Sequence, residues 1–187
     1  MKVLTRYAKK RLKRIRILLN SFPESNDLEM LHRLRLEIKK IKTLLLLIQY
    51  NHKSFKPHSF YIPFRTVFRA CEKIREPQVL FTLVVKFTGT TELSAPDLSG
   101  PIQLFLDEIP GYLRNVRKQE RILLKEIGKV KSKTYERYLR KKTKILRSSI
   151  YPGFKAADLH AIRKFIKEVY YLLCINNKNK LSRRSSK

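Results

Sequence analysis

The sequence predicts an all-α protein, and three observations support this fold class. The chain contains only five glycines in 187 residues. Its apolar residues recur at the three- and four-residue spacing of amphipathic helices over long stretches. Hydrophobic residues make up 43% of the chain, which is enough for a core and excludes a compositionally disordered protein. A chain of this length is expected to form one domain, with room for two lobes.

The first predicted helix covers Val3 to Phe22. One side of it carries an apolar stripe at helical spacing, and basic residues cover much of the rest. The helix is expected to end at Phe22, because the residue before a proline is disfavoured in the α-helical region. The apolar stripe consists of Leu4, Ala8, Leu12, Ile15 and Leu19.

The second predicted helix runs to about Asn51, with Ser25, Asn26 or Asp27 as its N-cap. Its central part, residues 31–48, carries two stripes side by side. At 100° per residue, one histidine and three cations share an arc of about 80° next to an apolar stripe suited to a core. The first stripe consists of His32, Arg35, Lys39 and Lys42, and the apolar stripe of Leu31, Leu34, Ile38, Ile41, Leu45 and Ile48.

A connection is predicted from Lys53 to Pro63, followed by a third helix that begins near Pro63 or Phe64. Pro77 is expected to kink or split this helix after Glu76. The apolar segment 79–85 is expected to continue the helix as a buried segment, and a strand is the alternative. Basic residues recur along the helix every four positions, at Arg65, Arg69 and Lys73.

The segment from Thr88 to Pro101 collects loop-forming residues and is predicted to be a hinge. A short helix is expected over residues 102–109, ended by Pro110 and Gly111. A long amphipathic stretch follows over residues 112–148, with a bend expected at Gly128. This stretch is rich in basic residues, among them Arg137, Arg140, Lys141 and Lys144.

The Tyr-Pro-Gly sequence at 151–153 is expected to precede a last helix over about residues 155–175, and residues 176–187 are predicted to form a basic, disordered tail. The last helix repeats the spacing of the second. A shared His-x-x-Arg-x-x-x-Lys spacing is less common by chance than apolar periodicity alone. We therefore interpret the two helices as an internal repeat, with halves of about 1–88 and 101–175. When the two helices are aligned, His32 corresponds to His160, Arg35 to Arg163 and Lys39 to Lys167.

The charge balance predicts a polyanionic partner. Lysine and arginine number 43 against 15 aspartates and glutamates, which gives a formal net charge of +28. A net charge of about 2 to 8 is sufficient for the solubility of a small domain, and self-repulsion at larger charge destabilises the compact state. The excess therefore indicates binding to nucleic acid, an anionic membrane or a phosphate polymer.

We expect neither an enzyme nor a metal or cofactor site. Gly128 and Lys129 are not preceded by the leading glycine of a phosphate-binding loop, and no two glutamates stand two positions apart as in the E-x-E motif of triphosphate hydrolases. No serine or cysteine has an evident histidine and acid context. The four histidines lack zinc-ligand spacing, and they are His32, His52, His58 and His160.

The sequence favours a cytoplasmic protein. Cys71 and Cys174 lie within apolar helical patterns and are expected to be buried free thiols, so nothing indicates an oxidising compartment. The longest uninterrupted apolar run, residues 169–175, is too short to span a membrane. Residues 1–19 are too densely basic to contain the apolar core of a signal peptide.

Three motifs resemble those of the CHAD family, a helical domain named for its histidines. Residues 31–42 resemble its first signature, which is an apolar residue, His, two positions, Arg, and then a basic-basic-apolar-basic group. Residues 69–76, Arg-Ala-Cys-Glu-Lys-Ile-Arg-Glu, resemble its second signature. Residues 159–171 resemble its second histidine helix, so the resemblance spans nearly the whole chain.

This resemblance implies antiparallel helical bundles related by pseudo-twofold symmetry, with a basic groove or channel that binds inorganic polyphosphate without catalysis. Three positions depart from the family pattern, because Glu72 replaces a small glycine, Glu76 an aspartate and Tyr170 an arginine. The repeat counterpart of Arg75 falls beyond Lys187, so the second bundle is expected to be truncated. The chain is then either a natural short form, or a partner chain in a homo-oligomer covers the gap.

The candidate polyphosphate contacts come from several helices. Binding to the nucleic-acid backbone is the alternative function, and a peripheral membrane protein whose first helix lies on anionic lipid is a third. The expected location is the cytoplasm, in association with polyphosphate granules. The candidate contacts are His32, Arg35, Lys39, Lys42, Arg65, Arg69, Lys73, Arg75, Arg137, Arg140, Lys141, Lys144, His160, Arg163 and Lys167.

Overall fold

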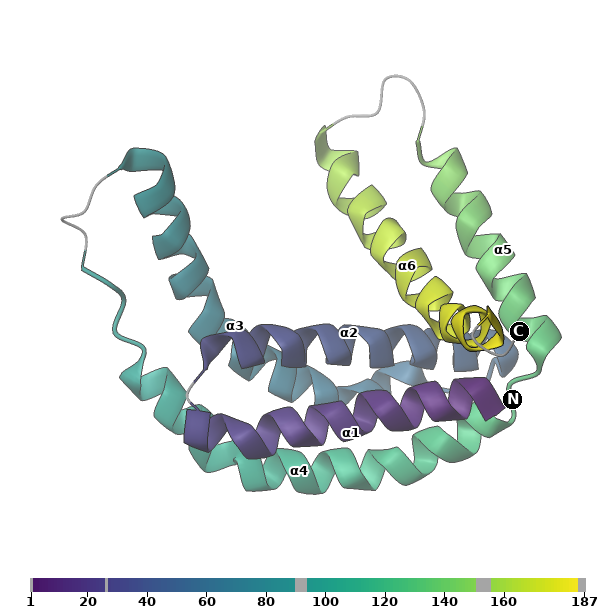
Figure 1. The fold of residues 1–187 in the computed structure, drawn as a ribbon, viewed down its shortest axis with the longest axis horizontal. Coiled ribbons are helices and arrows are strands. Elements are labelled where there is room, and N and C mark those ends of the chain that lie inside the picture. The colour runs from purple at the N-terminus through teal and green to yellow at the C-terminus, as the bar shows by residue number, and fades with distance from the viewer. Residues whose placement is uncertain (1, 26, 90–93, 151–155, 185–187) are drawn as a thin grey trace. The chain divides into compact units, whose positions relative to one another are not determined.

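The computed structural model describes residues 2–25, 27–89, 94–150 and 156–184. These residues form helices joined by turns and connections, without any strand, which confirms the predicted all-α class (Figure 1). The helices are α1 (Lys2–Ser25), α2 (Leu28–Asn51), α3 (Pro57–Thr88), α4 (Ser99–Gly128), α5 (Ser132–Ser148) and α6 (Ala156–Arg184).

The boundary between α1 and α2 lies close to its predicted place. α1 continues through Pro23 to Ser25, so its predicted end at Phe22 is three residues too early. A proline in the last turn removes few backbone hydrogen bonds, because little helix remains beyond it. Asp27 is the N-cap of α2, since its Oδ1 accepts a hydrogen bond of 2.8 Å from the backbone N–H of Glu29.

α3 begins at Pro57, so the predicted connection from Lys53 to Pro63 is wrong over its second half. Proline suits a first helical turn because its fixed φ is already helical and its missing N–H needs no partner there. The helix ends at Thr88, where Gly89 adopts φ +67° and its N–H donates to the carbonyl of Val85 at 3.0 Å. This is the left-handed C-terminal cap that glycine permits.

The second part of α3 is helical but not buried. The helix is continuous through Pro77 and changes direction along its length (Figure 1). Leu80 is 63% exposed and Leu83 is 44% exposed, so the predicted burial of residues 79–85 is wrong. The bend carries this part of the helix away from the rest of its unit, and its apolar side chains consequently remain uncovered.

α4 is a single helix through Pro110 and Gly111, so the predicted short helix over 102–109 is wrong. Buried apolar residues lie on both sides of the proline at helical spacing, and their packing outweighs the one hydrogen bond that proline removes. α4 ends at Gly128 and α5 begins at Ser132, so the predicted stretch 112–148 forms two helices. The buried residues are Phe105, Ile109, Tyr112 and Val116.

α6 runs from Ala156 to Arg184, nine residues beyond the predicted end at Ile175. The predicted break at 151–153 lies outside the described residues. Cys71 is a buried free thiol as predicted, and burial raises its pKa to about 12. Cys174 is also free but only half-buried, so its predicted burial is wrong.

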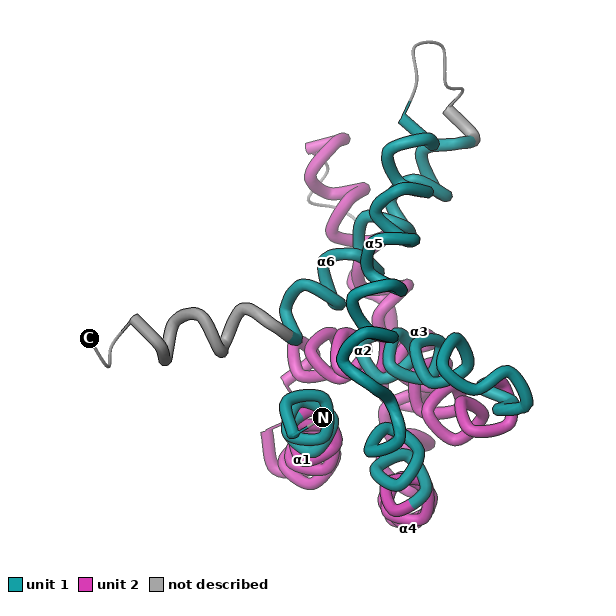
Figure 2. The backbone as a smooth tube through the Cα atoms, turned by 90° about the vertical axis from the view of Figure 1, so that its right-hand side faces the viewer, with its two compact units in different colours: residues 1–10, 40–57, 122–187 teal, residues 11–39, 58–121 magenta. Residues whose placement is uncertain are grey.

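The chain divides into two compact units, each assembled from separate segments (Figure 2). Unit 1 contains residues 1–10, 40–57 and 122–187, and unit 2 contains residues 11–39 and 58–121. This division differs from the sequence halves at about 1–88 and 101–175. The internal repeat therefore stays a prediction.

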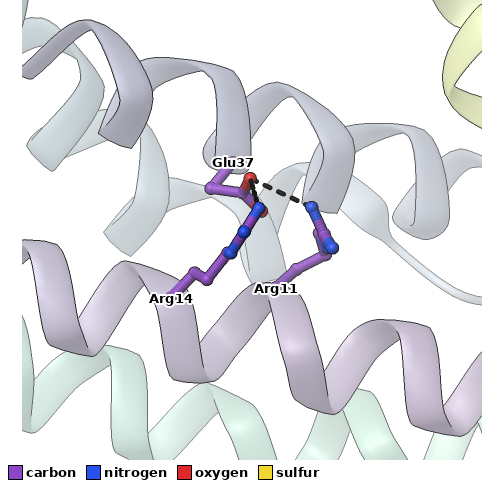
Figure 3. A network of polar contacts seen from close by, with 3 residues as sticks. All are labelled: Arg11, Arg14 and Glu37. Carbon is purple, nitrogen blue, oxygen red and sulfur yellow. Dashed lines mark hydrogen bonds and ion pairs between the residues drawn. The ribbon is translucent and has the colours of Figure 1, made fainter. Parts of the chain in front are cut away.

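Unit 2 has an apolar core crossed by one buried ion pair. Phe22 and Phe105 meet edge to face with ring centroids 5.3 Å apart. Nη1 of Arg11 donates to Oε1 of Glu37 at 3.0 Å, and both side chains are almost fully buried. Arg14 approaches the same carboxylate oxygen at 3.6 Å from a more exposed position (Figure 3). Two arginines of α1 thus neutralise one buried glutamate of α2.

Unit 1 is held together by tyrosines that connect α5 to its neighbours. The hydroxyl of Tyr135 donates to the carbonyl of Leu172 at 2.8 Å, and burial raises the pKa of Tyr135 to about 12. The ring of Tyr138 lies 4.9 Å from the ring of Tyr50 on α2, centroid to centroid. Because a buried hydroxyl without a partner is costly, the hydrogen bond of Tyr135 helps to fix the inner face of α5. The ring contact of Tyr138 holds the same face against α2.

Candidate functional site

Part of the predicted row on α2 packs against α3 in unit 2. Nη2 of Arg35 donates to Oε1 of Glu72 at 2.8 Å, and the guanidinium lies 4.4 Å from the ring centroid of Phe68. Nζ of Lys39 lies 5.4 Å from the same ring. We call His32, Arg35, Lys39, Phe68, Glu72, Arg75 and Glu29 the Phe68 cluster.

His32 and Arg75 complete the Phe68 cluster. Arg75 Nη1 lies 3.6 Å from Oε2 of Glu29. Burial lowers the pKa of His32, and the positive charge of Arg75 lowers it further, while Glu29 acts in the opposite direction. The imidazole of His32 is therefore mainly neutral at pH 7, where it can donate one hydrogen bond and accept another.

Acidic side chains within the Phe68 cluster neutralise much of its positive charge. Glu72 stands where the CHAD signature that residues 69–76 resemble has glycine, and it pairs with Arg35, which was predicted to contact phosphate. The pairing of Glu72 and the stacking on Phe68 were not predicted from the sequence. The available signal was their spacing, since residues four apart share one face of a helix and so can engage one partner.

The remaining predicted residues of α2 and α3 lie elsewhere. Lys42 is exposed and belongs to unit 1. Arg65, Arg69 and Lys73 are exposed on another flank of α3 in unit 2, where they line one pocket together with residues of α4. None of these three cations forms a hydrogen bond or ion pair with another described residue. The pocket also has apolar lining residues, of which Leu104 and Phe105 are two.

The four predicted residues of α5 belong to a longer cationic row in unit 1. All members are exposed, and at 100° per residue they share an arc of about 120°. Their side chains form no hydrogen bond or ion pair with the rest of the described chain, and Lys141 alone lies over a ring, 5.6 Å from the centroid of Tyr50. We call this set the α5 row, and it consists of Lys133, Arg137, Arg140, Lys141, Lys144 and Arg147.

The other face of α5 fixes the helix in place. The hydroxyl of Tyr138 donates to Oε1 of Glu168 at 2.7 Å, and Nζ of Lys142 donates to Oε2 of the same carboxylate at 3.0 Å. Burial, followed by the hydrogen bond to Glu168, raises the pKa of Tyr138 well above its ordinary value. The role of Glu168 as the anchor of α5 was not predicted from the sequence. Its only sequence signal was an acidic residue within a basic helix.

The predicted residues of α6 do not join the α5 row. α6 contacts α5 through Phe165, Glu168 and Leu172. Helical geometry at 100° per residue places His160, Arg163 and Lys167 on a different side of α6. His160 and Arg163 are exposed and Lys167 is half-buried. Within each unit, the predicted contacts therefore form separate surfaces.

Two further properties bound the chemistry of the described residues. Histidine, cysteine, aspartate and glutamate side chains do not gather there in groups of three or more that could hold a metal ion. Within the same residues, no helix combines the length and apolarity needed to cross a membrane.

The comparisons with known proteins leave the family open. The resemblance to the CHAD family rests on the motif residues at 31–42, 69–76 and 159–171. Compared with family models, with curated proteins and with solved structures, the chain gives no match.

Proposed function

We propose that the protein binds inorganic polyphosphate without catalysis, and that the α5 row is its principal contact. The observation that carries the proposal is the α5 row itself, because six exposed cations follow one face of a single helix without internal ionic partners. α5 has 17 residues and only one acidic side chain, Glu136. The motif resemblance supports the choice of polyphosphate among polyanions.

The dimensions of the α5 row suit an extended anionic chain. Lys133 and Arg147 lie fourteen residues apart, which corresponds to about 21 Å along the helix. Arginine forks and lysine ammonium groups both form charge-assisted hydrogen bonds with phosphate oxygens. Because the inner face of α5 is fixed by Tyr135, Tyr138 and Lys142, the backbone need not reorder when a ligand binds.

The proposal also covers partners and location. It places the protein in the cytoplasm with polyphosphate granules, and it assigns nucleic acid a weaker, charge-based affinity. α6 exposes Leu159, Ile166 and Leu173 beside its cations. We assign this apolar strip to contact with a second copy of the chain, since exposed apolar clusters mark protein interfaces.

The test compares two variants that remove the same charge from exposed arcs of two helices. The first carries glutamine at Arg137, Arg140, Lys141 and Lys144, and the control carries glutamine at Arg114, Arg117, Lys118 and Arg121 of α4. Binding to long-chain polyphosphate is measured by calorimetry between about 50 and 300 mM salt. Over this range the Debye length falls from roughly 14 to 6 Å.

The α5 variant should bind about 100-fold more weakly, since four exposed contacts of about 0.7 kcal/mol each correspond to that factor. The slope of log K against log salt should fall from about 4 to about 1.4, because about 0.7 counterions are released per neutralised charge. The control should lose much less. Equal losses in the two variants would show attraction by net charge alone. Displacement by duplex DNA or RNA at equal phosphate concentration would favour the nucleic-acid alternative.

A further inference from the structure

One pocket of unit 2 combines a cationic wall with an apolar wall. It lies between α3 and the first half of α4 and has a volume of about 650 Å³, within the range of about 300 to 1,000 Å³ typical of small-molecule sites. Arg65, Arg69 and Lys73 form the cationic wall, at intervals of four residues over about 12 Å of α3. Pro101, Leu104, Phe105, Glu108 and Tyr112 of α4 also line it.

The apolar wall is firmly anchored yet leaves a large side chain in solvent. Phe105 and Tyr112 are buried, with ring centroids 5.6 Å apart, and Phe105 also contacts Phe22 of the core. Leu104, one residue before Phe105, is 68% exposed at the pocket. The wall is therefore held in place by the core of unit 2 while still offering apolar surface to a ligand.

The acid of the pocket restricts the charge of a ligand. Glu108 lines the pocket from α4, whereas the cations line it from α3. A long phosphate chain that fills the pocket would bring negative charge close to this carboxylate, which Coulomb repulsion disfavours. It would also leave the exposed apolar side chain of Leu104 unused. A single anionic group on the α3 side avoids both costs.

We propose that this pocket binds an amphiphilic organic anion. Its single phosphate or carboxylate head contacts Arg65, Arg69 and Lys73, and its apolar body lies against Pro101 and Leu104. The three cations form no ion pair with another described residue, so they are available for charge-assisted hydrogen bonds with the head. The apolar body removes Leu104 from water. This site is independent of the α5 row, which belongs to the other unit.

Dodecyl phosphate, used below the concentration at which it forms micelles, is a suitable probe. Calorimetry is carried out at about 150 mM salt, where the Debye length is about 8 Å. Dodecyl phosphate should bind there with a stoichiometry of one. It should bind at least about tenfold more tightly than inorganic phosphate and than neutral dodecyl maltoside, because only it uses both walls. Equal affinity for dodecyl phosphate and either comparison ligand would overturn the proposal.

Matched variants locate the site. Arg69→Gln should weaken dodecyl phosphate binding about tenfold or more, whereas Arg117→Gln removes the same charge from an exposed place outside the pocket and should change little. Leu104→Asn should weaken dodecyl phosphate but not inorganic phosphate, and Leu80→Asn, at an equally exposed leucine, should affect neither. Equal effects within either pair of variants would show that the pocket is not the site.

Two sources of the ligand can be separated in the same experiment. Vesicles of phosphatidylglycerol and phosphatidylcholine present the head within a membrane, whereas dodecyl phosphate presents it free in solution. If Arg69→Gln lowers vesicle binding more than Arg117→Gln does, the pocket takes a lipid in the membrane. If the two variants bind vesicles equally and Arg69→Gln still loses dodecyl phosphate, the ligand is a free amphiphile. The fourfold α5 variant should keep its affinity for dodecyl phosphate, which separates this proposal from that of polyphosphate binding.

Discussion

The two helices that share the His-x-x-Arg-x-x-x-Lys spacing differ in their surroundings. On α2, the whole predicted apolar stripe from Leu31 to Ile48 is buried. On α6, Ile162, Val169 and Leu172 are buried, but Leu159 and Ile166 are about half exposed. The spacing of a motif thus determines which side chains align along one helix, whereas the elements packed around the helix determine whether they are covered.

The cationic rows of these helices differ in the same way. Arg35 on α2 is stacked on Phe68 and paired with Glu72, and its side chain is 15% exposed. Arg163, its predicted counterpart on α6, is exposed and forms no hydrogen bond or ion pair with another described residue. The same spacing therefore gives a structural residue, Arg35, on α2 and a solvent-exposed residue, Arg163, on α6.

The largest expected contrast concerns the apolar stripes. Leu34→Ala on α2 should lower the free energy of unfolding by about 2 to 5 kcal/mol, because it leaves a cavity at a fully buried position. At protein concentrations where the chain is monomeric, Leu173→Ala on α6 should change it by about 0.5 kcal/mol or less, since this leucine then contacts water. Urea unfolding followed by circular dichroism measures both values. Similar losses under these conditions would contradict the contrast between the two helices.

A smaller contrast is expected between two glutamates. Glu37→Gln on α2 should lower the free energy of unfolding by about 3 kcal/mol or more, because the charge of Arg11 then remains buried without its counterion. Glu168→Gln on α6 should cost about 1 to 2 kcal/mol, since Lys142 and Glu168 are partly accessible to water. The same urea series compares them. A larger loss for Glu168→Gln would reverse the assignment of α2 as the more tightly packed helix.

The smallest expected effect is a pH dependence at His32. The pKa of His32 is lowered in the folded state, so the unfolded chain binds more protons below the ordinary value of 6.5. The contribution of this histidine to stability is therefore present above pH 6.5 and decreases as the pH falls towards the folded pKa. An NMR titration should show the lowered pKa directly. Arg75→Gln should raise it by removing a positive charge, and an unchanged titration in that variant would contradict the assigned cause.

Much of the fold could be predicted from apolar periodicity, and the errors have a common origin. The second helix was expected to end at about Asn51 and does so. The predicted stops at Pro23 and Pro110 are wrong because local proline chemistry was weighed without the packing of residues such as Phe105 and Tyr112. The predicted burial of residues 79–85 is wrong for the opposite reason, since an apolar composition cannot show that a bend removes the segment from its neighbours.

The candidate site was less predictable because it depends on partners distant in the sequence. The sequence identified the cations of α3, but not that Arg35 pairs with Glu72 while Arg69 lines a pocket together with Leu104. The α5 row was more accessible, since its alignment follows from the spacing along a single helix. Residues on one element could be grouped in advance, and contacts between elements could not.

The two free thiols offer an internal reporter on the opening of unit 2, together with its reference. Cys71 lies in unit 2, where burial keeps its sulfur both inaccessible and protonated, whereas Cys174 lies in unit 1 at a half-buried position. Because only the exposed thiolate reacts with alkylating reagents, modification of Cys71 requires unit 2 to open. The alkylation rate of Cys71 would therefore time the opening of unit 2, with the partly exposed Cys174 as an internal reference, in the unmodified protein and without any introduced label.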